Sequence, residues 1–215
     1  ITSESFIAAA KLEREIETLR SRVTVCFLER IRDEISPTIK IKSLILSLIP
    51  KTAHRIVRGD SGAGSPAVIL FTSGSEGTPK GVVLSHKNLL SNFAQVENII
   101  DLTRKDRVLN VLPIFHSFGL LGGLLVPLLK GTPSYQYPSP LHYRVIPDLC
   151  YSLGVTCLFG TTTFLRGYGR NAHPYDFHKM RYVISGAEKM TRETRDLWAE
   201  KFGLRIFEGY GITEA

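Results

Sequence analysis

Two hydrophobic patterns alternate along the chain from about residue 105 to its end. Short apolar runs bounded by glycine, proline or charged residues are typical of strands, and longer segments with apolar residues at i, i+3, i+4 and i+7 are typical of helices. Repeated strand–helix units predict an α/β fold with layered, largely parallel sheets and helices on both faces. The predicted strands are 107–112, 134–137, 155–159, 181–185 and 205–208, and the predicted helices are 120–129, 141–153, 162–169 and 191–202.

The most apolar of these segments, Leu120–Leu129, is expected to be a buried helix. It contains two glycines and a proline, and it falls well short of the roughly 20 apolar residues that cross a bilayer. We therefore expect no membrane span there.

Residues 1–60 are predicted to form a leading α/β segment. Ser3 is a suitable N-cap for a helix to about Arg20, and Val23–Leu28 has the pattern of a strand. Lys40–Ile49 places four apolar residues at helical spacing between lysines, which suits either a membrane interface or packing against another domain, and its short length favours packing. The small-residue linker Arg58–Ser65 then leads into an α/β core that spans residues 61–215.

The core begins with a stretch whose parts are typical of an anion site. Residues 67–72 form an apolar strand that we expect to be covered on both faces, and the loop 73–81 follows with three glycines, several hydroxyl residues and Lys80. Glycine lets backbone N–H groups approach phosphate oxygens closely, and the lysine adds a positive charge. A second strand comes next, and Ser85 is a suitable N-cap for a helix to Ile100.

A phosphate-binding loop is one of two interpretations of residues 73–81. The other is a glycine-rich β-hairpin whose lysine is only solvated, but the clustered hydroxyls and the lysine behind a proline favour phosphate. A Walker loop is disfavoured, because Pro79 stands where that motif needs a glycine and Gly81 stands where it needs Ser or Thr.

Composition limits the class of protein without naming a ligand. At 215 residues, 43% hydrophobic and 22% charged, the chain is an ordinary globular type rather than a disordered one. Its net charge of +7 suits anionic ligands or surfaces, and residues 35–59 include five basic residues and no acidic one. The three cysteines, at positions 26, 150 and 157, lack metal-ligand or CxxC spacing, so we expect reduced thiols in a cytosolic compartment.

Each candidate loop follows the carboxyl end of a predicted strand. Ligands of largely parallel sheets gather at these ends, so the loops are expected to form one composite site. The loops are 73–81, 115–119, 160–163, 186–188 and 209–214.

The loop in ISGAEKM, residues 184–190, is one candidate for contact with a planar ligand. Gly186 and Ala187 leave room for a flat ring against the backbone, and Glu188 can accept a hydrogen bond from an amino group. An ordinary turn, with Thr191 capping the next helix, explains the same residues equally well.

The last loop, in FEGYGITEA, is a stronger candidate. Glycines on both sides of Tyr210 let its ring lie beside a flat ligand, Thr213 offers a hydroxyl, and Glu214 offers a carboxylate suited to Mg²⁺. A surface tyrosine in a glycine-rich turn would explain the glycines but not the Thr-Glu pair.

The motif TSGSEGTPKGV, residues 72–82, resembles the phosphate-loop signature of the adenylate-forming enzymes, the family of acyl-CoA synthetases, luciferases and peptide-synthetase adenylation domains. That signature usually has threonine where this chain has Ser75 and Glu76. The two later loops resemble the family's adenine-binding and AMP-binding motifs in the expected order, and FHSFG around His116 resembles its aromatic-histidine motif. The resemblance implies a fragment of the large N-terminal domain of such an enzyme, with residues 61–215 as its nucleotide- and acyl-binding core.

By that resemblance the cofactors are ATP and Mg²⁺, and Glu214 is the residue that holds the metal. Tyr210 is expected to stack on adenine, Thr213 to contact the α-phosphate and His116 to contact the acyl group, while Lys80 neutralises phosphate charge. The expected catalytic residues are thus Lys80, His116, Thr213 and Glu214. The expected nucleotide-binding residues are Thr72, Ser73, Gly74, Ser75, Glu76, Gly77, Thr78, Lys80, Gly186, Ala187, Glu188, Gly209, Tyr210, Gly211 and Thr213.

Further motifs are similar to those of one bacterial branch, the acyl-[acyl-carrier-protein] synthetases linked to 2-acylglycerophosphoethanolamine acyltransferases, in which the Ser-Glu pair is usual. This likeness implies that a long-chain fatty acid is activated with ATP and passed to the thiol of acyl carrier protein or CoA. It also implies a link to a membrane lysophospholipid at the cytoplasmic side of the bacterial inner membrane, and no nucleic-acid partner. The motifs are SPLHYR (139–144), LFGTTTFL (158–165), PYDF (174–177), SGAEKM and TSGSEG.

Two other functions share an anion loop: a phosphotransferase or nucleotide hydrolase, and a non-catalytic nucleotide-binding module. The first would release phosphate without an acid substrate, and the second would never exchange pyrophosphate. The chain does not start with Met and lacks a signal-peptide layout, so we expect a piece of a longer protein. The family's ribose-binding aspartate and catalytic lysine are then expected beyond Ala215, and the piece alone is expected to turn over little.

The apolar residues around His116 predict one wall of an acyl tunnel. Gly119, Gly122 and Gly123 are expected to leave space that larger side chains would fill. The surrounding apolar residues are Phe115, Phe118, Leu120, Leu121, Leu124 and Leu125.

Overall fold

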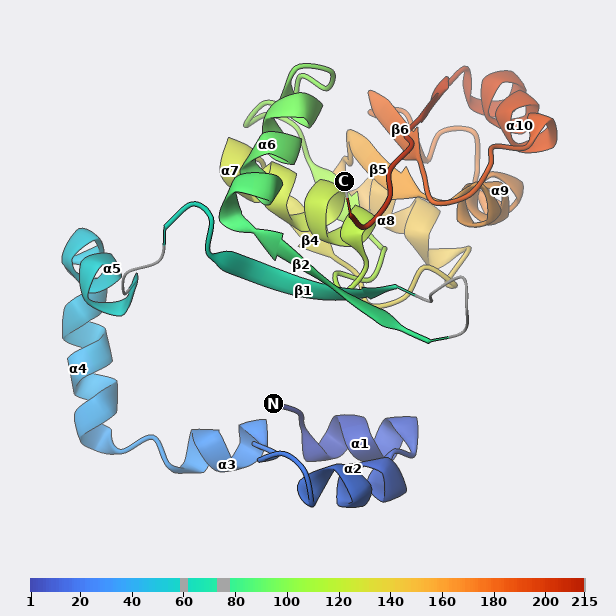
Figure 1. Cartoon of the computed structure of the whole chain (residues 1–215). Helices are drawn as coiled ribbons and strands as arrows, with labels where there is room; N and C mark the ends of the chain where they lie inside the picture. Colours follow the sequence, from blue (N-terminus) through green and yellow to red (C-terminus); the bar gives the residue numbers. More distant parts are fainter. Residues whose placement is uncertain (59–61, 73–77, 215) are drawn as a thin grey trace. The chain divides into compact units, whose positions relative to one another are not determined.

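The computed structural model describes residues 1–58, 62–72 and 78–214 (Figure 1). The chain forms two compact units, residues 1–61 and residues 62–215. We call them unit 1 and unit 2.

Unit 1 opens with two helices in place of the single predicted one. The hydroxyl of Ser3 accepts a hydrogen bond from the backbone N–H of Phe6 and caps α1 (Glu4–Ala10), so the predicted cap is confirmed. The helix ends at Lys11, whose φ of 55° is left-handed, and α2 (Glu13–Arg20) begins after it. The predicted continuous helix to Arg20 is therefore wrong, because a left-handed residue interrupts the helical hydrogen bonds.

The predicted strand Val23–Leu28 is also wrong. In the described part of unit 1 this segment makes one bridge, between Phe27 and Thr2, and a single bridge does not continue into a ladder. Helix α3 starts at Leu28 instead. The remaining helices of the unit are α3 (Leu28–Asp33), α4 (Pro37–Ser47) and α5 (Pro50–Arg58).

Unit 2 begins with an antiparallel hairpin of β1 (Pro66–Thr72) and β2 (Lys80–Ser85). Both strands are as predicted, but the expected cover on both faces of the first strand is wrong. Of the described hairpin residues, Leu70 alone is buried, whereas Phe71 is 74% exposed. An antiparallel pair can pack one face on the core and leave the other in water, so an apolar run does not require two covered faces.

A five-stranded parallel sheet forms the centre of unit 2, which confirms the predicted α/β fold. Its strand order is β4-β3-β5-β6-β7. Asparagine, glutamine, glycine, serine and glutamate end the strands, so polar and small residues collect at the carboxyl edge. The strands are β3 (Val108–Asn110), β4 (Ser134–Gln136), β5 (Cys157–Gly160), β6 (Tyr182–Ser185) and β7 (Ile206–Glu208).

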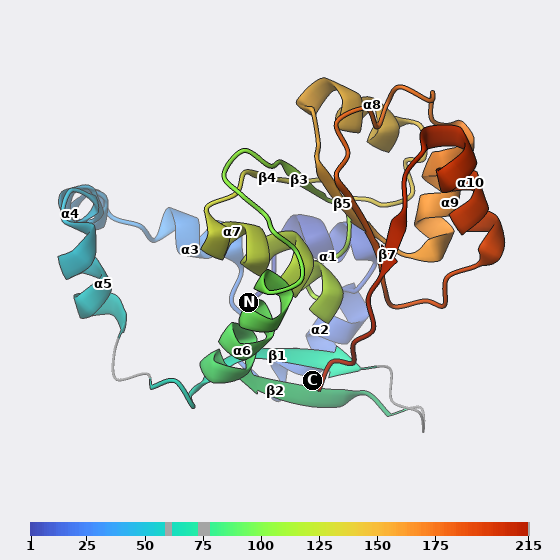
Figure 2. The ribbon, with the colours of Figure 1, turned by 90° about the horizontal axis from the view of Figure 1, so that it is seen from above.

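Helices cover both faces of this sheet (Figure 2). Successive strand residues point to opposite faces, so Cys157 packs into a core with α6 and α7 while Leu158 packs into a core with α8, α9 and α10. Burial raises the pKa of the Cys150 and Cys157 thiols far above the ordinary value, which keeps them protonated and unreactive. The helices are α6 (His86–Glu97), α7 (Val126–Lys130), α8 (Val145–Leu153), α9 (Thr162–Asn171) and α10 (Arg192–Phe202).

The predicted buried helix Leu120–Leu129 is in part wrong. Residues Gly119–Leu125 form a π-helix, η1, and α7 continues from it, but Leu128 and Leu129 are 67% and 49% exposed. Among the described residues no helix is both long and apolar enough to cross a membrane.

A buried carboxylate fixes the amino ends of the central strands. Asp106 is 1% exposed and accepts hydrogen bonds from Thr103, Thr156 and Arg181 at 2.7 to 2.9 Å. Burial by itself raises the pKa of Asp106, but these hydrogen bonds outweigh it and the pKa lies below its ordinary value. The network joins the segments that lead into β3, β5 and β6, and so sets where their carboxyl ends lie.

Candidate functional site

Loops from neighbouring parallel strands meet at the carboxyl edge of the sheet. The backbone N–H of Gly186, after β6, donates to the carbonyl oxygen of Gly160 at 3.2 Å, and that of Gly209, after β7, donates to Ser185 at 2.7 Å. Residues 160–163, 186–188 and 209–214 therefore lie next to one another. Phe118, from the loop after β3, reaches the same place, because its ring would lie 3.1 Å from a Cβ atom on Gly186.

Of the predicted phosphate loop, the described residues 78–81 lead into and begin β2 of the hairpin, which is not a strand of the parallel sheet. Ser73, Gly74, Ser75, Glu76 and Gly77 lie outside the described residues. On either side of them Thr72 pairs with Lys80 in the hairpin register, and Thr78 and Lys80 are exposed. A hairpin with an exposed lysine is common to both interpretations of this loop, so the phosphate role of Lys80 stays a prediction.

The loop 186–188 has an unusual backbone conformation, and the carboxylate of Glu188 anchors it to α9. Ala187 has a φ of 65°, which costs a residue with a Cβ atom roughly 1–2 kcal/mol. Next to it, Oε2 of Glu188 accepts hydrogen bonds from the backbone N–H and the hydroxyl of Thr163, at 3.1 and 2.8 Å. Glu188, predicted to accept from a ligand amino group, is thus bound to the first turn of α9. Residues 160–163 and 186–188 were predicted to share one site, but a bond between Thr163 and Glu188 was not predicted.

His116 is exposed at the surface of the loop after β3. Its Nδ1 accepts a hydrogen bond from the backbone N–H of Phe118 at 3.3 Å, which orients the ring. The ring of Phe118 in turn packs edge-on against Phe159 with centroids 5.8 Å apart. The loop is therefore anchored by its aromatic residue, and contact of His116 with an acyl group stays a prediction.

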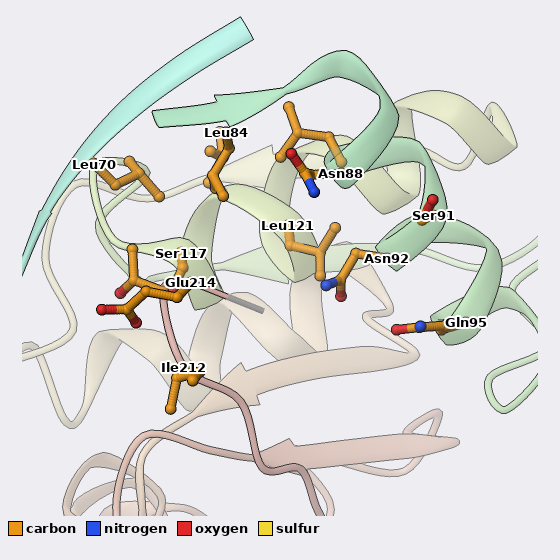
Figure 3. Close-up of a pocket in the computed structure, with 13 residues that line it drawn as sticks. Leu70, Leu84, Asn88, Ser91, Asn92, Gln95, Ser117, Leu121, Ile212 and Glu214 are labelled. Atoms are coloured by element: carbon orange, nitrogen blue, oxygen red, sulfur yellow. The ribbon is translucent and has the colours of Figure 1, made fainter. Parts of the chain in front are cut away.

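A pocket of about 280 Å³ contains two of the predicted site residues, Thr213 and Glu214 (Figure 3). It opens between the hairpin, α6, η1 and the C-terminal segment. Its apolar lining is mainly leucine, and its polar lining carries amide, hydroxyl and carboxylate groups. The lining residues are Leu70, Leu84, Asn88, Leu89, Ser91, Asn92, Gln95, Ser117, Leu120, Leu121, Ile212, Thr213 and Glu214.

Sequence reasoning missed the contribution of α6 to this pocket. Asn88, Ser91, Asn92 and Gln95 stand at i, i+3, i+4 and i+7 and line it from one face of the helix. From the sequence this helix was predicted by its N-cap and its extent, with no role in a site. A polar stripe at helical spacing, in the helix that follows the anion loop, was the signal available.

Tyr210 and the glycines beside it are at the surface. The Tyr210 side chain is 95% exposed, and no described atom lies within 4 Å of where a Cβ atom on Gly211 would be. The ring therefore has space for a stacking partner, but stacking on adenine stays a prediction.

The expected space at Gly119, Gly122 and Gly123 is not present. A Cβ atom on Gly119 would lie 2.3 Å from the carbonyl oxygen of Pro113, and one on Gly123 would lie 2.1 Å from Cγ of Asn110. On Gly122 it would lie 2.9 Å from the ring of Phe159. These glycines permit close packing of η1 on the sheet, so the predicted tunnel wall is wrong at these positions.

The residues present suit a magnesium nucleotide. No group of three or more His, Cys, Asp or Glu side chains with the spacing of a metal site occurs in the described ranges. Mg²⁺ is commonly held by one or two carboxylates together with the phosphates of a bound nucleotide, which is the setting that Glu214 beside Thr213 offers. A lone carboxylate beside hydroxyl and amide groups therefore fits the metal when the nucleotide supplies the other ligands.

Comparison with known proteins identifies the family to which the sequence is similar. The model of the AMP-binding family, described as AMP-binding enzyme, matches residues 8–215. The medium-chain-fatty-acid–[acyl-carrier-protein] ligase JamA of Moorena producens (strain JHB) is 30% identical over 213 residues, which cover 87% of this chain and 34% of that protein. The medium-chain fatty-acid–CoA ligase of Escherichia coli (strain K12) is 31% identical over 159 residues, covering 69% of this chain and 26% of that protein.

A solved structure agrees with the fold. The ATP-bound MatB of Rhodopseudomonas palustris superimposes with a TM-score of 0.66 and 33% identity, over 72% of this chain and 31% of that one. The chain thus spans about a quarter to a third of the length of the relatives that it matches.

Proposed function

The chain belongs to the AMP-binding enzyme family, and on that premise we propose that it supplies the nucleotide- and acyl-binding part of an acyl-adenylating ligase. In the first step a fatty-acid carboxylate oxygen attacks the α-phosphorus of ATP, the bond from that phosphorus to the bridging oxygen breaks, and pyrophosphate leaves. In the second step a thiolate attacks the acyl carbonyl carbon of the acyl-AMP and AMP leaves. The observation that carries the proposal is the meeting of loops 160–163, 186–188 and 209–214 at one sheet edge, beside a pocket with Thr213 and Glu214.

The side chains act by position and charge, because neither step needs an enzyme nucleophile. Lys80 neutralises charge on the phosphates, and Thr213 donates a hydrogen bond to the α-phosphate. Glu214 holds Mg²⁺, which when bound offsets charge on the nucleotide phosphates. A preorganised charge that stabilises the transition state contributes roughly 10²–10³-fold in rate.

We propose a long-chain fatty acid as substrate. Leu70, Leu84, Leu89, Leu120 and Leu121 make much of the pocket lining, and burying each methylene contributes about 0.8 kcal/mol. Several extra carbons in such a lining favour a long acid over a short one by orders of magnitude. His116 is proposed to contact the carboxyl end of the chain.

The thiol acceptor is proposed to be acyl carrier protein or CoA. JamA is named for a carrier-protein acceptor and the Escherichia coli relative for CoA, which supports both classes without separating them. A link to lysophospholipid reacylation at the cytoplasmic side of the inner membrane belongs to the same proposal. It is supported only by the likeness of five motifs, which are SPLHYR, LFGTTTFL, PYDF, SGAEKM and TSGSEG.

Acid-dependent exchange between ATP and pyrophosphate in the whole protein tests the proposal. With saturated acids from butyrate to palmitate, exchange is expected to rise with chain length, and Lys80→Ala and Glu214→Ala are each expected to lower it about 10²-fold. Added Mg²⁺ partly restores Glu214→Ala by mass action and leaves Lys80→Ala unchanged. Lys105→Ala is the matched control for Lys80→Ala, since Lys105 is exposed and precedes the amino end of β3, away from the carboxyl edge of the sheet.

Two outcomes would reject the proposed acyl-adenylating activity. Phosphate release without any acid would indicate a phosphotransferase or hydrolase, and nucleotide binding without exchange would indicate a binding module. Rescue of Lys80→Ala by Mg²⁺, with none for Glu214→Ala, would overturn the metal-ligand assignment alone.

A further inference from the structure

Helices α4 and α5 expose an apolar surface that unit 1 does not cover. Between residues 37 and 58 every large apolar side chain except that of Leu46, which is half-buried, is at least 47% exposed, and Leu48 and Val57 reach 77% and 78%. An exposed apolar patch of this kind marks an interaction site more often than inert surface. The exposed apolar residues are Ile39, Ile41, Leu44, Ile45, Leu48, Ile49, Ile56 and Val57. Together with the basic residues named in the next paragraph, they form what we call the α4–α5 surface.

The same helices are uniformly basic. Lys40, Lys42, Lys51 and Arg55 are exposed, Arg58 adds a fifth positive charge, and residues 35–59 include no acidic residue. The rest of the chain mixes both signs. A partner of this surface is therefore anionic as well as apolar.

In α5 the two kinds of residue lie on opposite sides of the helix. At 100° per residue, Lys51, His54 and Arg55 share one side, and Ile56 and Val57 share the other. This is the arrangement of a helix that lies in the plane of a bilayer surface, with its basic side on lipid phosphates.

In α4 the apolar residues spread over roughly half or more of the helix circumference at that spacing. Four of them, Ile41, Leu44, Ile45 and Leu48, stand at i, i+3, i+4 and i+7, which is the stripe of a helix that docks in a protein groove. Ile39 and Ile49 widen the arc beyond that stripe. A wide apolar arc suits a fluid layer into which the helix sinks. Lys42, which falls within the arc, can extend its methylene stem through that layer to the phosphates.

We propose that the α4–α5 surface binds the surface of an anionic lipid bilayer. The short length of residues 40–49 alone favoured packing on another domain, but α5 extends the basic and apolar surface to residue 58. Spanning is not part of the proposal, because no described helix is long and apolar enough to cross a membrane. The proposal rests on unit 1 alone and holds whether or not the proposed ligase activity is correct.

Co-sedimentation of the 215-residue chain with vesicles tests it. Vesicles of phosphatidylglycerol and phosphatidylethanolamine are expected to bind the chain, phosphatidylcholine vesicles to bind it far less, and added salt to weaken binding. Lys51→Gln with Arg55→Gln is expected to weaken binding to the anionic vesicles about 30-fold, at roughly a factor of five for each charge. Leu44→Ser with Leu48→Ser is expected to weaken binding to a similar degree without changing its salt dependence.

Lys105→Gln with Lys179→Gln is the matched control, because it removes two exposed charges from unit 2 and is expected to bind as the unchanged chain does. Circular dichroism of each variant checks that the helices remain. Equal loss in the control and in the α5 variant would show a response to net charge and overturn the proposal. Absence of vesicle binding by the unchanged chain would also overturn the proposal. So would α4 and α5 variants that keep vesicle binding and instead lose binding to an acyl carrier protein.

Discussion

Replacing Gly123 with alanine tests how tightly η1 is packed on the sheet. The new Cβ atom would lie 2.1 Å from Cγ and 2.2 Å from Oδ1 of Asn110, so the asparagine must move. Asn110 is 1% exposed, donates to the carbonyl oxygen of Leu112 and to Oε1 of Gln136, and accepts from the N–H of Leu112, at 2.8 to 3.1 Å. At about 1 kcal/mol for each lost hydrogen bond, and more where a buried group stays unpaired, Gly123→Ala is expected to lower the free energy of unfolding by roughly 3–5 kcal/mol.

Urea unfolding of the chain, followed by circular dichroism, measures this change. Gly211→Ala is the matched control, because no described atom lies within 4 Å of its Cβ position, and it is expected to stay within about 0.5 kcal/mol of the unchanged chain. Adding Asn110→Ala to Gly123→Ala relieves the clash, so the double variant is expected to lose less than the sum of the single changes. Equal midpoints for Gly123→Ala and the unchanged chain would refute the reasoning and reopen the space that an acyl chain requires.

Two further predictions concern carboxylates. Thr163→Val removes the hydroxyl that binds Glu188, so it is expected to cost about 1 kcal/mol of stability. In the whole protein it is expected to weaken ATP binding several-fold, as measured by calorimetric titration, and to leave the KM for the fatty acid unchanged. An unchanged ATP affinity would show that this loop does not contact the nucleotide. The pKa of Asp106 is lower in the folded chain than its ordinary value of 3.8, so its contribution to stability is complete above about pH 4 and is lost as pH falls through the folded pKa. Asp106→Asn is accordingly expected to be less stable at pH 7 and to unfold with a shallower acid dependence, and identical acid profiles would contradict this assignment.

Local chemistry made much of the fold predictable. Ser3, Ser85 and Thr191 cap helices through their hydroxyls, as expected, because an N-cap needs one residue and its own backbone neighbours. The five strands of the parallel sheet were also predicted within two residues or so, since each is a short apolar run between charged or small residues. Parallel pairing then follows from the intervening helices.

Features that depend on distant neighbours were not predictable in the same way. Val23–Leu28 has strand residues but meets a single pairing partner in the described part of unit 1. Strand β1 is apolar although one face of its hairpin is exposed. The glycines of η1 could leave space or permit close contact, and the positions of Pro113, Asn110 and Phe159 decide between the two. The sequence of η1 is compatible with either outcome, so the error at the tunnel wall was one of packing and not of motif.

Glu188 shows how far a motif defines a role. Its carboxylate was predicted to accept a hydrogen bond from a ligand amino group, and in the structure Oε2 accepts from Thr163. A carboxylate has two oxygens and about four acceptor sites, so the contact with α9 leaves Oε1 able to accept from a ligand. Because the contact already fixes the side chain and the left-handed Ala187 beside it, a ligand that binds there would not have to order them. The two roles are therefore compatible, and the bond to Thr163 is what would make Glu188 a preorganised acceptor.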